Sequence, residues 1–205
     1  MDSRTIYEAL RSKIIHLELA PESVLNLSEL AEEFGVSRTP IKEVLITLQA
    51  EEWIMRQGTH FIVTPLSLER IREITEIRMV MEVQANIWAM QRITSEEKQH
   101  LLQLKERIAS FDANSPNQSI VDFDSEIHRV IFTAARNAQL TTMLERILSH
   151  YLRFWLSSPR IIDPEVFFSE AVELIDAIAA GDEDGVRTCT VRHIRNSVAE
   201  IMGTR

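Results

Sequence analysis

The sequence is poor in several residue types, and each shortage excludes a class of protein. Its 205 residues include 1 cysteine, Cys189, so an internal disulfide is excluded and a reducing compartment is expected. With 5 glycines, 6 prolines and 6% aromatic residues, the chain fits neither a disordered protein nor a β-sandwich. No apolar run approaches the roughly 18 residues of a membrane span, and no signal peptide is recognisable. We therefore expect a helical, cytoplasmic protein without a membrane partner.

Positive charge is also scarce. The chain carries 22 basic against 31 acidic residues, which gives a net charge of −9. Domains that bind nucleic acid are usually basic, so the overall charge argues against such a partner. The hydrophobic content of 45% is sufficient for a packed core. The length corresponds to one or two domains, at roughly 150 residues each.

The periodicity of the apolar residues changes along the chain and separates two domains. In residues 1–66, helical spacing gives way to β-type runs on either side of Gly58, a residue typical of a hairpin turn. In residues 67–205, helical segments are separated by polar or proline-containing breaks. We expect helices over residues 5–19, 27–34 and 38–50, and then over 68–90, 95–111, 119–136, 139–156, 164–180 and 183–202. The predicted fold is mainly α: a winged helix-turn-helix of three helices and a β-hairpin, followed by an antiparallel six-helix bundle.

The most informative stretch of the first domain is LAEEFGVSRTP, residues 30–40. Its glycine provides a turn between two helices, and Ser37 caps the second helix, which presents Arg38 and Thr39 outward. Lys42 follows one turn later on the same face. A helix N-terminus offers free N–H groups to phosphate, and an arginine can donate two hydrogen bonds to guanine. The stretch therefore predicts a DNA recognition helix; the alternative is a small helical domain with two surface cations.

Residues 21–63 resemble the DNA-binding domain of the GntR family of bacterial transcription regulators, above all in the segment LAEEFGVSRTPIKEVLITLQAE. The resemblance implies that the recognition helix binds an operator in double-stranded DNA while the wing enters the minor groove. The residues implied are Ser37, Arg38, Thr39, Lys42, Gly58, Thr59 and His60. The chain departs from the family at Ser28, Lys42 and Glu52, so the operator sequence cannot be copied from relatives.

The charge of this domain requires an explanation of its own. Residues 1–64 contain six basic and ten acidic residues, a balance of −4. A single domain of this kind would bind phosphate poorly unless its few cations cluster. We therefore expect a homodimer with two-fold symmetry, which doubles the contacts to a palindromic operator.

The second domain contains one pair of residues with the spacing of metal ligands. Asp124 and His128 lie one helical turn apart and share a face. A carboxylate and an imidazole so placed can form half of a metal site, and a surface ion pair is the alternative. His193 lies on the last helix, which an antiparallel bundle could bring opposite them.

Residues 68–202 resemble the all-helical effector domain, or FCD domain, of FadR-type GntR regulators, in its six-helix form. The matching pieces are residues 78–82, residues 124–128 with Asn137, and residues 174–178 leading to His193. The resemblance implies a small carboxylic acid as effector, often beside a divalent metal held by one aspartate and three histidines. Asp124, His128 and His193 match three of these ligands.

Ala171 takes the place of the fourth ligand, and its methyl group cannot bind a metal. The adjacent Glu170 should point about 100° around the helix and is a poor substitute. Two possibilities remain: three ligands hold zinc with water or effector, or the site has lost its metal and binds the effector directly. Arg78 is the candidate for the effector's carboxylate, unless it pairs with Glu82 on the helix surface. Arg153 is a second candidate of the same kind.

These features together predict a ligand-responsive transcription regulator, more specifically a repressor, that binds DNA as a homodimer and is not an enzyme. One rival hypothesis is a metal-dependent enzyme on the helical bundle, with Asp124 and His128 as catalytic residues. Another is a helical module that binds protein instead of DNA.

Overall fold

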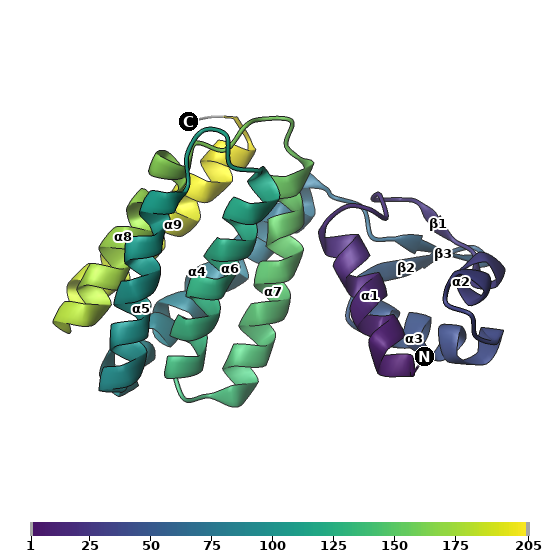
Figure 1. Cartoon of the computed structure of the whole chain (residues 1–205), viewed down its shortest axis with the longest axis horizontal. Helices are drawn as coiled ribbons and strands as arrows, with labels where there is room; N and C mark the ends of the chain where they lie inside the picture. The colour runs from purple at the N-terminus through teal and green to yellow at the C-terminus, as the bar shows by residue number, and fades with distance from the viewer. Residues whose placement is uncertain (1, 204–205) are drawn as a thin grey trace. The chain divides into compact units, whose positions relative to one another are not determined.

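The computed structural model describes residues 2–203 and divides the chain into two compact units, Met1–Ser67 and Leu68–Arg205. Helices predominate in the described residues, and the strands are confined to the N-terminal unit (Figure 1). The predicted fold class, a winged helix-turn-helix followed by a helical bundle, is confirmed. None of the helices within residues 2–203 combines the length and apolar character of a membrane span.

The N-terminal unit combines three helices with a small sheet. Its elements are α1 (Ser3–Ile15), β1 (Val24–Leu25), α2 (Leu27–Glu33), α3 (Arg38–Ala50), β2 (Ile54–Gln57) and β3 (His60–Val63). Helix α1 packs on α3 because each buries apolar residues at helical spacing, such as Ile6 and Leu10 against Leu45 and Leu48. Trp53 is fully buried in the same core.

The sheet has one strand more than the sequence predicts. The expected hairpin of β2 and β3 is present, and β1 adds antiparallel to its free side, in the order β1-β3-β2. Leu25 of β1 is buried opposite Phe61. Two residues are too few to show an alternating pattern, so this strand leaves no signal in the sequence.

Two local predictions in this unit are corrected. The first helix ends at Ile15, not at residue 19, because Leu17 adopts a left-handed backbone with φ 61° and turns the chain. Ser37 occupies the N-cap position of α3, but its side chain makes no capping hydrogen bond. The predicted turn before it is confirmed, since Gly35 has φ 63°.

The C-terminal unit contains the six predicted α-helices and one short 3₁₀ turn at Ile108–Ser110. The helices are α4 (Leu68–Arg92), α5 (Ser95–Arg107), α6 (Asn117–Ala134), α7 (Ala138–Ser157), α8 (Pro164–Ala180) and α9 (Glu183–Ile201). Their starts follow the expected signals: Thr94 and Glu97 form a capping box, and Asp163 caps α8 ahead of Pro164.

Helix α4 is the centre of this unit, because it packs against α6, α7, α8 and α9. Its buried residues are mostly apolar but include a polar row: Arg78, Glu82 and Asn86 follow one another at intervals of one turn and are all buried. Asn86 Nδ2 donates to Thr190 Oγ1 of α9 at 3.0 Å. Polar groups are therefore buried at the core of the bundle, where each needs a partner.

Candidate DNA interface and effector cavity

Helix α3 divides into a buried face and an exposed face. Apolar side chains at helical spacing fix it in the unit, and Ile41 and Leu45 are fully buried. The opposite face presents Arg38, Thr39 and Lys42, which are exposed, within the first turn and a half. The helix start thus offers two cations, a hydroxyl and free backbone N–H groups on one accessible surface.

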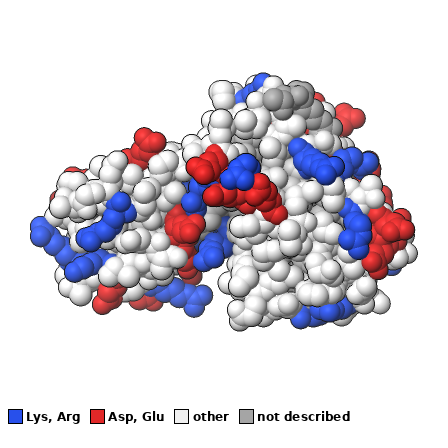
Figure 2. Space-filling model, turned by 180° about the vertical axis from the view of Figure 1, so that it is seen from behind, with Lys and Arg blue, Asp and Glu red and all other residues white. Residues whose placement is uncertain are grey.

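The basic residues of this unit divide into three that have an ion pair or stack on an aromatic ring and three that have no ion pair among the described residues. Arg4 pairs with Glu8 at 3.0 Å, Lys13 pairs with Glu33, and the Arg11 guanidinium lies 5.1 Å from the Trp53 ring centroid. Among residues 2–203, no ion pair is formed by the remaining three basic residues of the unit, Arg38, Lys42 and Arg56. Figure 2 shows a few Lys and Arg side chains grouped on the N-terminal unit, at the left, rather than an extended basic surface.

The wing is a tight hairpin. Gly58 and Thr59 form its two-residue turn, and Gly58 has φ 61°, a conformation that glycine adopts without a steric penalty. Thr59 and His60 are exposed at the tip. Arg56, also exposed, lies opposite Phe61, and its guanidinium is 5.2 Å from that ring. Sequence reasoning missed Arg56, although a basic residue beside a wing turn was a usable signal.

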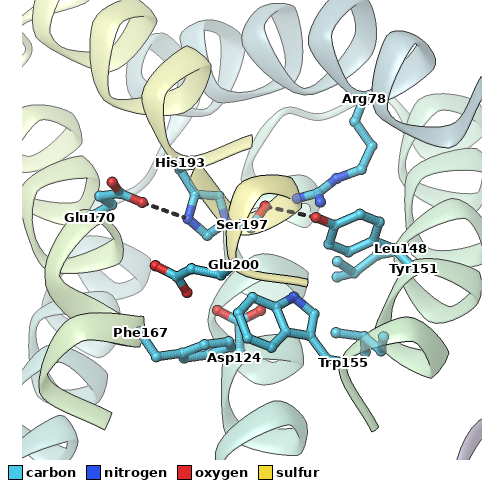
Figure 3. A pocket seen from close by; sticks show the side chains of 11 residues that line it. Arg78, Asp124, Leu148, Tyr151, Trp155, Phe167, Glu170, His193, Ser197 and Glu200 are labelled. Carbon is cyan, nitrogen blue, oxygen red and sulfur yellow. Dashed lines mark hydrogen bonds and ion pairs between the residues drawn. The ribbon is translucent and has the colours of Figure 1, made fainter. Parts of the chain in front are cut away.

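The C-terminal unit encloses a polar cavity lined by five of its helices, all but α5 (Figure 3). The cavity has a volume of about 10 Å³, which is room for about one water molecule. It is lined by Arg78, Asp124, Leu148, Tyr151, Leu152, Trp155, Phe167, Glu170, His193, Ser197 and Glu200. Three predicted effector ligands, Arg78, Asp124 and His193, are thus brought together.

Arg78 and Glu82 form an ion pair that is buried, not on the helix surface. Arg78 Nε donates to Glu82 Oε1 at 2.5 Å and Nη2 donates to Oε2 at 3.3 Å. Burial alone would lower the pKa of Arg78, but the facing Glu82 carboxylate raises it on balance. Burial likewise disfavours the ionised Glu82, yet Arg78 holds the pKa of that carboxyl below its ordinary value. Both groups are therefore charged inside the bundle.

One nitrogen of the Arg78 guanidinium makes no hydrogen bond within the described residues. The guanidinium stacks 4.1 Å from the Tyr151 ring, whose hydroxyl lies 2.9 Å from Ser197 Oγ. Burial raises the pKa of Tyr151 to about 12, so the hydroxyl stays neutral. In the described part of the chain, no hydrogen-bond partner is found for Arg78 Nη1. This donor is available to an anion that enters the cavity.

The predicted metal ligands lie near one another but do not converge on one point. Asp124 Oδ2 is 3.6 Å from His128 Nε2, and the His128 and His193 ring centroids are 5.5 Å apart. Burial lowers the pKa of His128, more than the Asp124 carboxylate raises it. Within residues 2–203, no group of three or more His, Cys, Asp or Glu side chains is arranged to hold a metal ion. The three predicted ligands are therefore near neighbours without a common coordination point in this structure.

Glu170 corrects one expectation. Its position, about 100° around the helix from Ala171, predicts a poor substitute for the missing ligand, but Glu170 is buried, and its Oε2 lies 3.7 Å from His193 Nδ1. Asn196 of α9 also donates to Glu170 Oε1. Ala171 is buried too, but it does not line the cavity. The carboxylate of Glu170 faces the histidine that was expected to bind the metal.

Comparison with known proteins decides the family. Residues 2–60 match the family described as bacterial regulatory proteins, gntR family, and residues 73–196 match the FCD domain. The chain belongs to the GntR family. It is a DNA-binding transcription regulator with an FCD domain, and not an enzyme. Members of this family bind DNA and often act as dimers, and FCD domains can bind metal.

Named relatives extend over nearly the whole of this GntR-family chain. It is 23% identical to the HTH-type transcriptional repressor RspR of Escherichia coli, over 94% of the chain and 86% of that protein. It is 24% identical to the regulator McbR of the same species, over 88% and 84%. The structure of Escherichia coli McbR/YncC has a TM-score of 0.86 at 20% identity and covers 98% of this chain and 97% of its own. At 20% sequence identity, this structural similarity is evidence for a shared fold alone.

Two predicted effector ligands, His128 and Arg153, do not line the cavity of this GntR-family bundle; His128 lies beside Asp124, whereas Arg153 lies elsewhere. It is buried on α7 but does not line the cavity, whereas Leu148, Tyr151 and Trp155 of the same helix do. Position 153 lies roughly 200° around the helix from position 151, so it faces other neighbours. Burial and the nearby Arg70 lower the pKa of Arg153 to about 10.

Proposed function

We propose that this GntR-family regulator is a repressor that binds a palindromic operator as a homodimer. The observation that carries the proposal is the position of Arg38, Lys42 and Arg56, the cations of the N-terminal unit without an ion pair among the described residues. They lie on the recognition helix and on the wing, so the limited positive charge is free where DNA would bind. Two copies would double these contacts and offset the acidic balance of the unit.

We propose further that a small carboxylic acid is the effector and binds in the cavity of the C-terminal unit. Arg78 would donate from Nη1 to its carboxylate, with Asp124 and His193 beside it and His128 behind Asp124. Effector affinity and operator affinity would then be linked, each changing the other by the same factor. Arg153 has no place in this site.

A divalent metal at Asp124, His128 and His193 stays a prediction, as does the cytoplasmic location. The test is the metal content of protein purified without chelators. Less than about a tenth of an equivalent contradicts a resident metal.

The operator proposal is tested by selecting DNA that binds the full-length protein from a random pool. We expect a palindromic consensus, with half-sites about one helical turn apart or a multiple of it. Titration of the selected duplex at several salt concentrations should give an affinity that falls steeply with salt. A consensus without symmetry contradicts the dimer, and an affinity independent of salt contradicts the phosphate contacts.

A further inference from the structure

The cavity of the C-terminal unit contains two buried groups of opposite charge, each with an unsatisfied atom. Arg78 and Asp124 are 1% and 4% exposed, and both line the cavity. Over residues 2–203, neither Arg78 Nη1 nor Asp124 Oδ1 has a hydrogen-bond partner. Buried polar groups are nearly always hydrogen-bonded. The two atoms therefore indicate a ligand that offers an acceptor to Arg78 and a donor to Asp124.

The charges around the cavity indicate which kind of donor fits. Carboxylates outnumber cations in its lining, which contains one cation, Arg78, and three carboxylates, those of Asp124, Glu170 and Glu200. The charge of Arg78 is already balanced by Glu82, with which it shares two hydrogen bonds. A ligand that brought only an additional negative charge would increase this excess. A ligand with a positive group as well would reduce it.

Asp124 is the lining carboxylate that has a buried oxygen without a hydrogen-bond partner in the described part of the chain. Arg192 Nε lies 4.0 Å from Glu170 Oε1, and Glu170 also faces His193. For Asp124, the ion-pair partner within the described residues is the buried His128 ring at 3.6 Å, and no Lys or Arg is within 4.0 Å. A charged donor such as an ammonium group binds a carboxylate more strongly than a neutral hydroxyl does.

Room for the rest of the ligand lies beside the polar cavity. A second cavity of about 250 Å³ shares Trp155, Phe167 and Glu200 with the first one. The Trp155 and Phe167 rings, which line both cavities, stand edge to face with their centroids 4.9 Å apart. The outer cavity is lined by the charged Arg160, Asp163 and Glu200 and also by apolar residues that are left open to solvent, Ile161 at 78% and Val166 at 46% exposure. An apolar group of the ligand would cover them.

We propose that the effector is an apolar α-amino acid, with its carboxylate on Arg78, its ammonium group on Asp124 and its side chain in the outer cavity. This inference rests on the proposed effector cavity and narrows its ligand from carboxylic acids in general to zwitterions. The polar cavity holds only about one water molecule, so binding must shift the shared side chains Trp155, Phe167 and Glu200 outward.

The test compares ligands that differ in a single group. Valine, leucine, methionine and phenylalanine are titrated calorimetrically into the full-length protein in the presence of a chelator, each beside its hydroxy acid and its deaminated acid. Because the ammonium group makes a charge-assisted hydrogen bond, at least one amino acid should bind about tenfold to a hundredfold more tightly than its two analogues. The chelator ensures that a metal does not supply the missing positive charge.

Two aspartates on α6 provide matched variants. Asp124→Asn keeps the shape of the side chain and removes its charge, so the preference for the amino acid over its hydroxy acid should fall to within about threefold. Asp122→Asn changes an exposed aspartate on the same helix and should leave the preference as it is. Circular dichroism establishes that each variant is folded, and the ligand series on the unaltered protein tests the proposal independently.

The outcomes separate this inference from the function on which it rests. If the deaminated acids bind as tightly as the amino acids, the zwitterion is wrong and the carboxylic acid effector stands. If a hydroxy acid binds only when zinc or manganese replaces the chelator, the partner of the Asp124 carboxylate is a metal ion and not an ammonium group. The inference is then overturned. If no compound of any series binds, the apolar amino acid is overturned, while the carboxylic acid effector in general and operator binding are unaffected.

Discussion

The two units of the protein use their positive charges in opposite ways. On the recognition helix of the N-terminal unit, Arg38 and Lys42 are exposed and have no ion pair among the described residues. In the core of the C-terminal unit, Arg78 is enclosed and hydrogen-bonded to Glu82. An exposed cation is solvated by water until DNA replaces that water, whereas a buried cation must be satisfied within the fold.

This difference separates binding from stability. A surface ion pair contributes about 0–1 kcal/mol to folding, so the cations of the recognition helix can be lost at little cost to the fold. Breaking a buried pair leaves one charge uncompensated and costs about 3–5 kcal/mol. Substitutions in the N-terminal site should therefore change DNA affinity alone, and substitutions at the buried pair should change stability first.

The largest effect on stability is expected on α4, which carries both a buried ion pair and an exposed one. Arg78→Met should lower the free energy of unfolding of the C-terminal unit by about 3–5 kcal/mol, because Glu82 stays buried without its partner. Arg72→Met is the matched control, since Arg72 pairs with Glu76 at the same spacing on α4, with side chains 58% and 64% exposed. This control should cost less than about 1 kcal/mol.

Urea denaturation followed by circular dichroism measures both variants. Equal losses would show that the buried pair is no more important to stability than the exposed one. A smaller loss in Arg78→Met with Glu82→Leu than in Arg78→Met alone would identify the uncompensated carboxylate as the cause.

The next largest effect is a change in DNA affinity that leaves the stability of the fold unaltered. Arg38→Ala should weaken operator binding by about tenfold to a hundredfold per half-site, because a two-pronged contact to guanine contributes about 1–3 kcal/mol of discrimination. Its unfolding free energy should match that of the unaltered protein. Arg4→Ala is the control, since Arg4 is an exposed cation of the same unit that pairs with Glu8 on α1. Fluorescence anisotropy with the selected operator measures both; equal affinities would remove Arg38 from the interface.

The same contrast explains how much the sequence could predict. The recognition helix is a local structure: the turn at Gly35, the start of α3 and the outward positions of Arg38 and Lys42 follow from about ten consecutive residues. Periodicity was also sufficient for all six helices of the bundle. The lack of a capping hydrogen bond from the Ser37 side chain and the presence of strand β1 were beyond such reasoning, because they depend on side-chain rotation and on pairing with β3.

The cavity is a tertiary structure, and local sequence patterns could indicate only some of the residues that line it. Arg78, Asp124 and His193 meet, although they come from three helices. The sequence could not fix which side of their helices Glu170 and Arg153 occupy, because the rotation of each helix about its axis is set by packing, and neighbouring positions differ by about 100°. A one-residue difference in which side of α8 or α7 faces inward therefore exchanges one cavity residue for another.

The smallest effect tests whether the wing belongs to the surface that binds DNA. Arg56 lies on β2 beside the turn, and a cation there reaches phosphates rather than base edges if the wing follows the groove. Arg56→Ala should thus weaken all DNA sequences alike, by a few-fold, and reduce the slope of log affinity against log salt by about one for each wing. Arg38→Ala, in contrast, should relax the preference for the consensus. If Arg56→Ala changed sequence preference and left the salt slope unaltered, the wing would be reading bases, and its exposed cation would belong with the recognition helix in function as well as in charge.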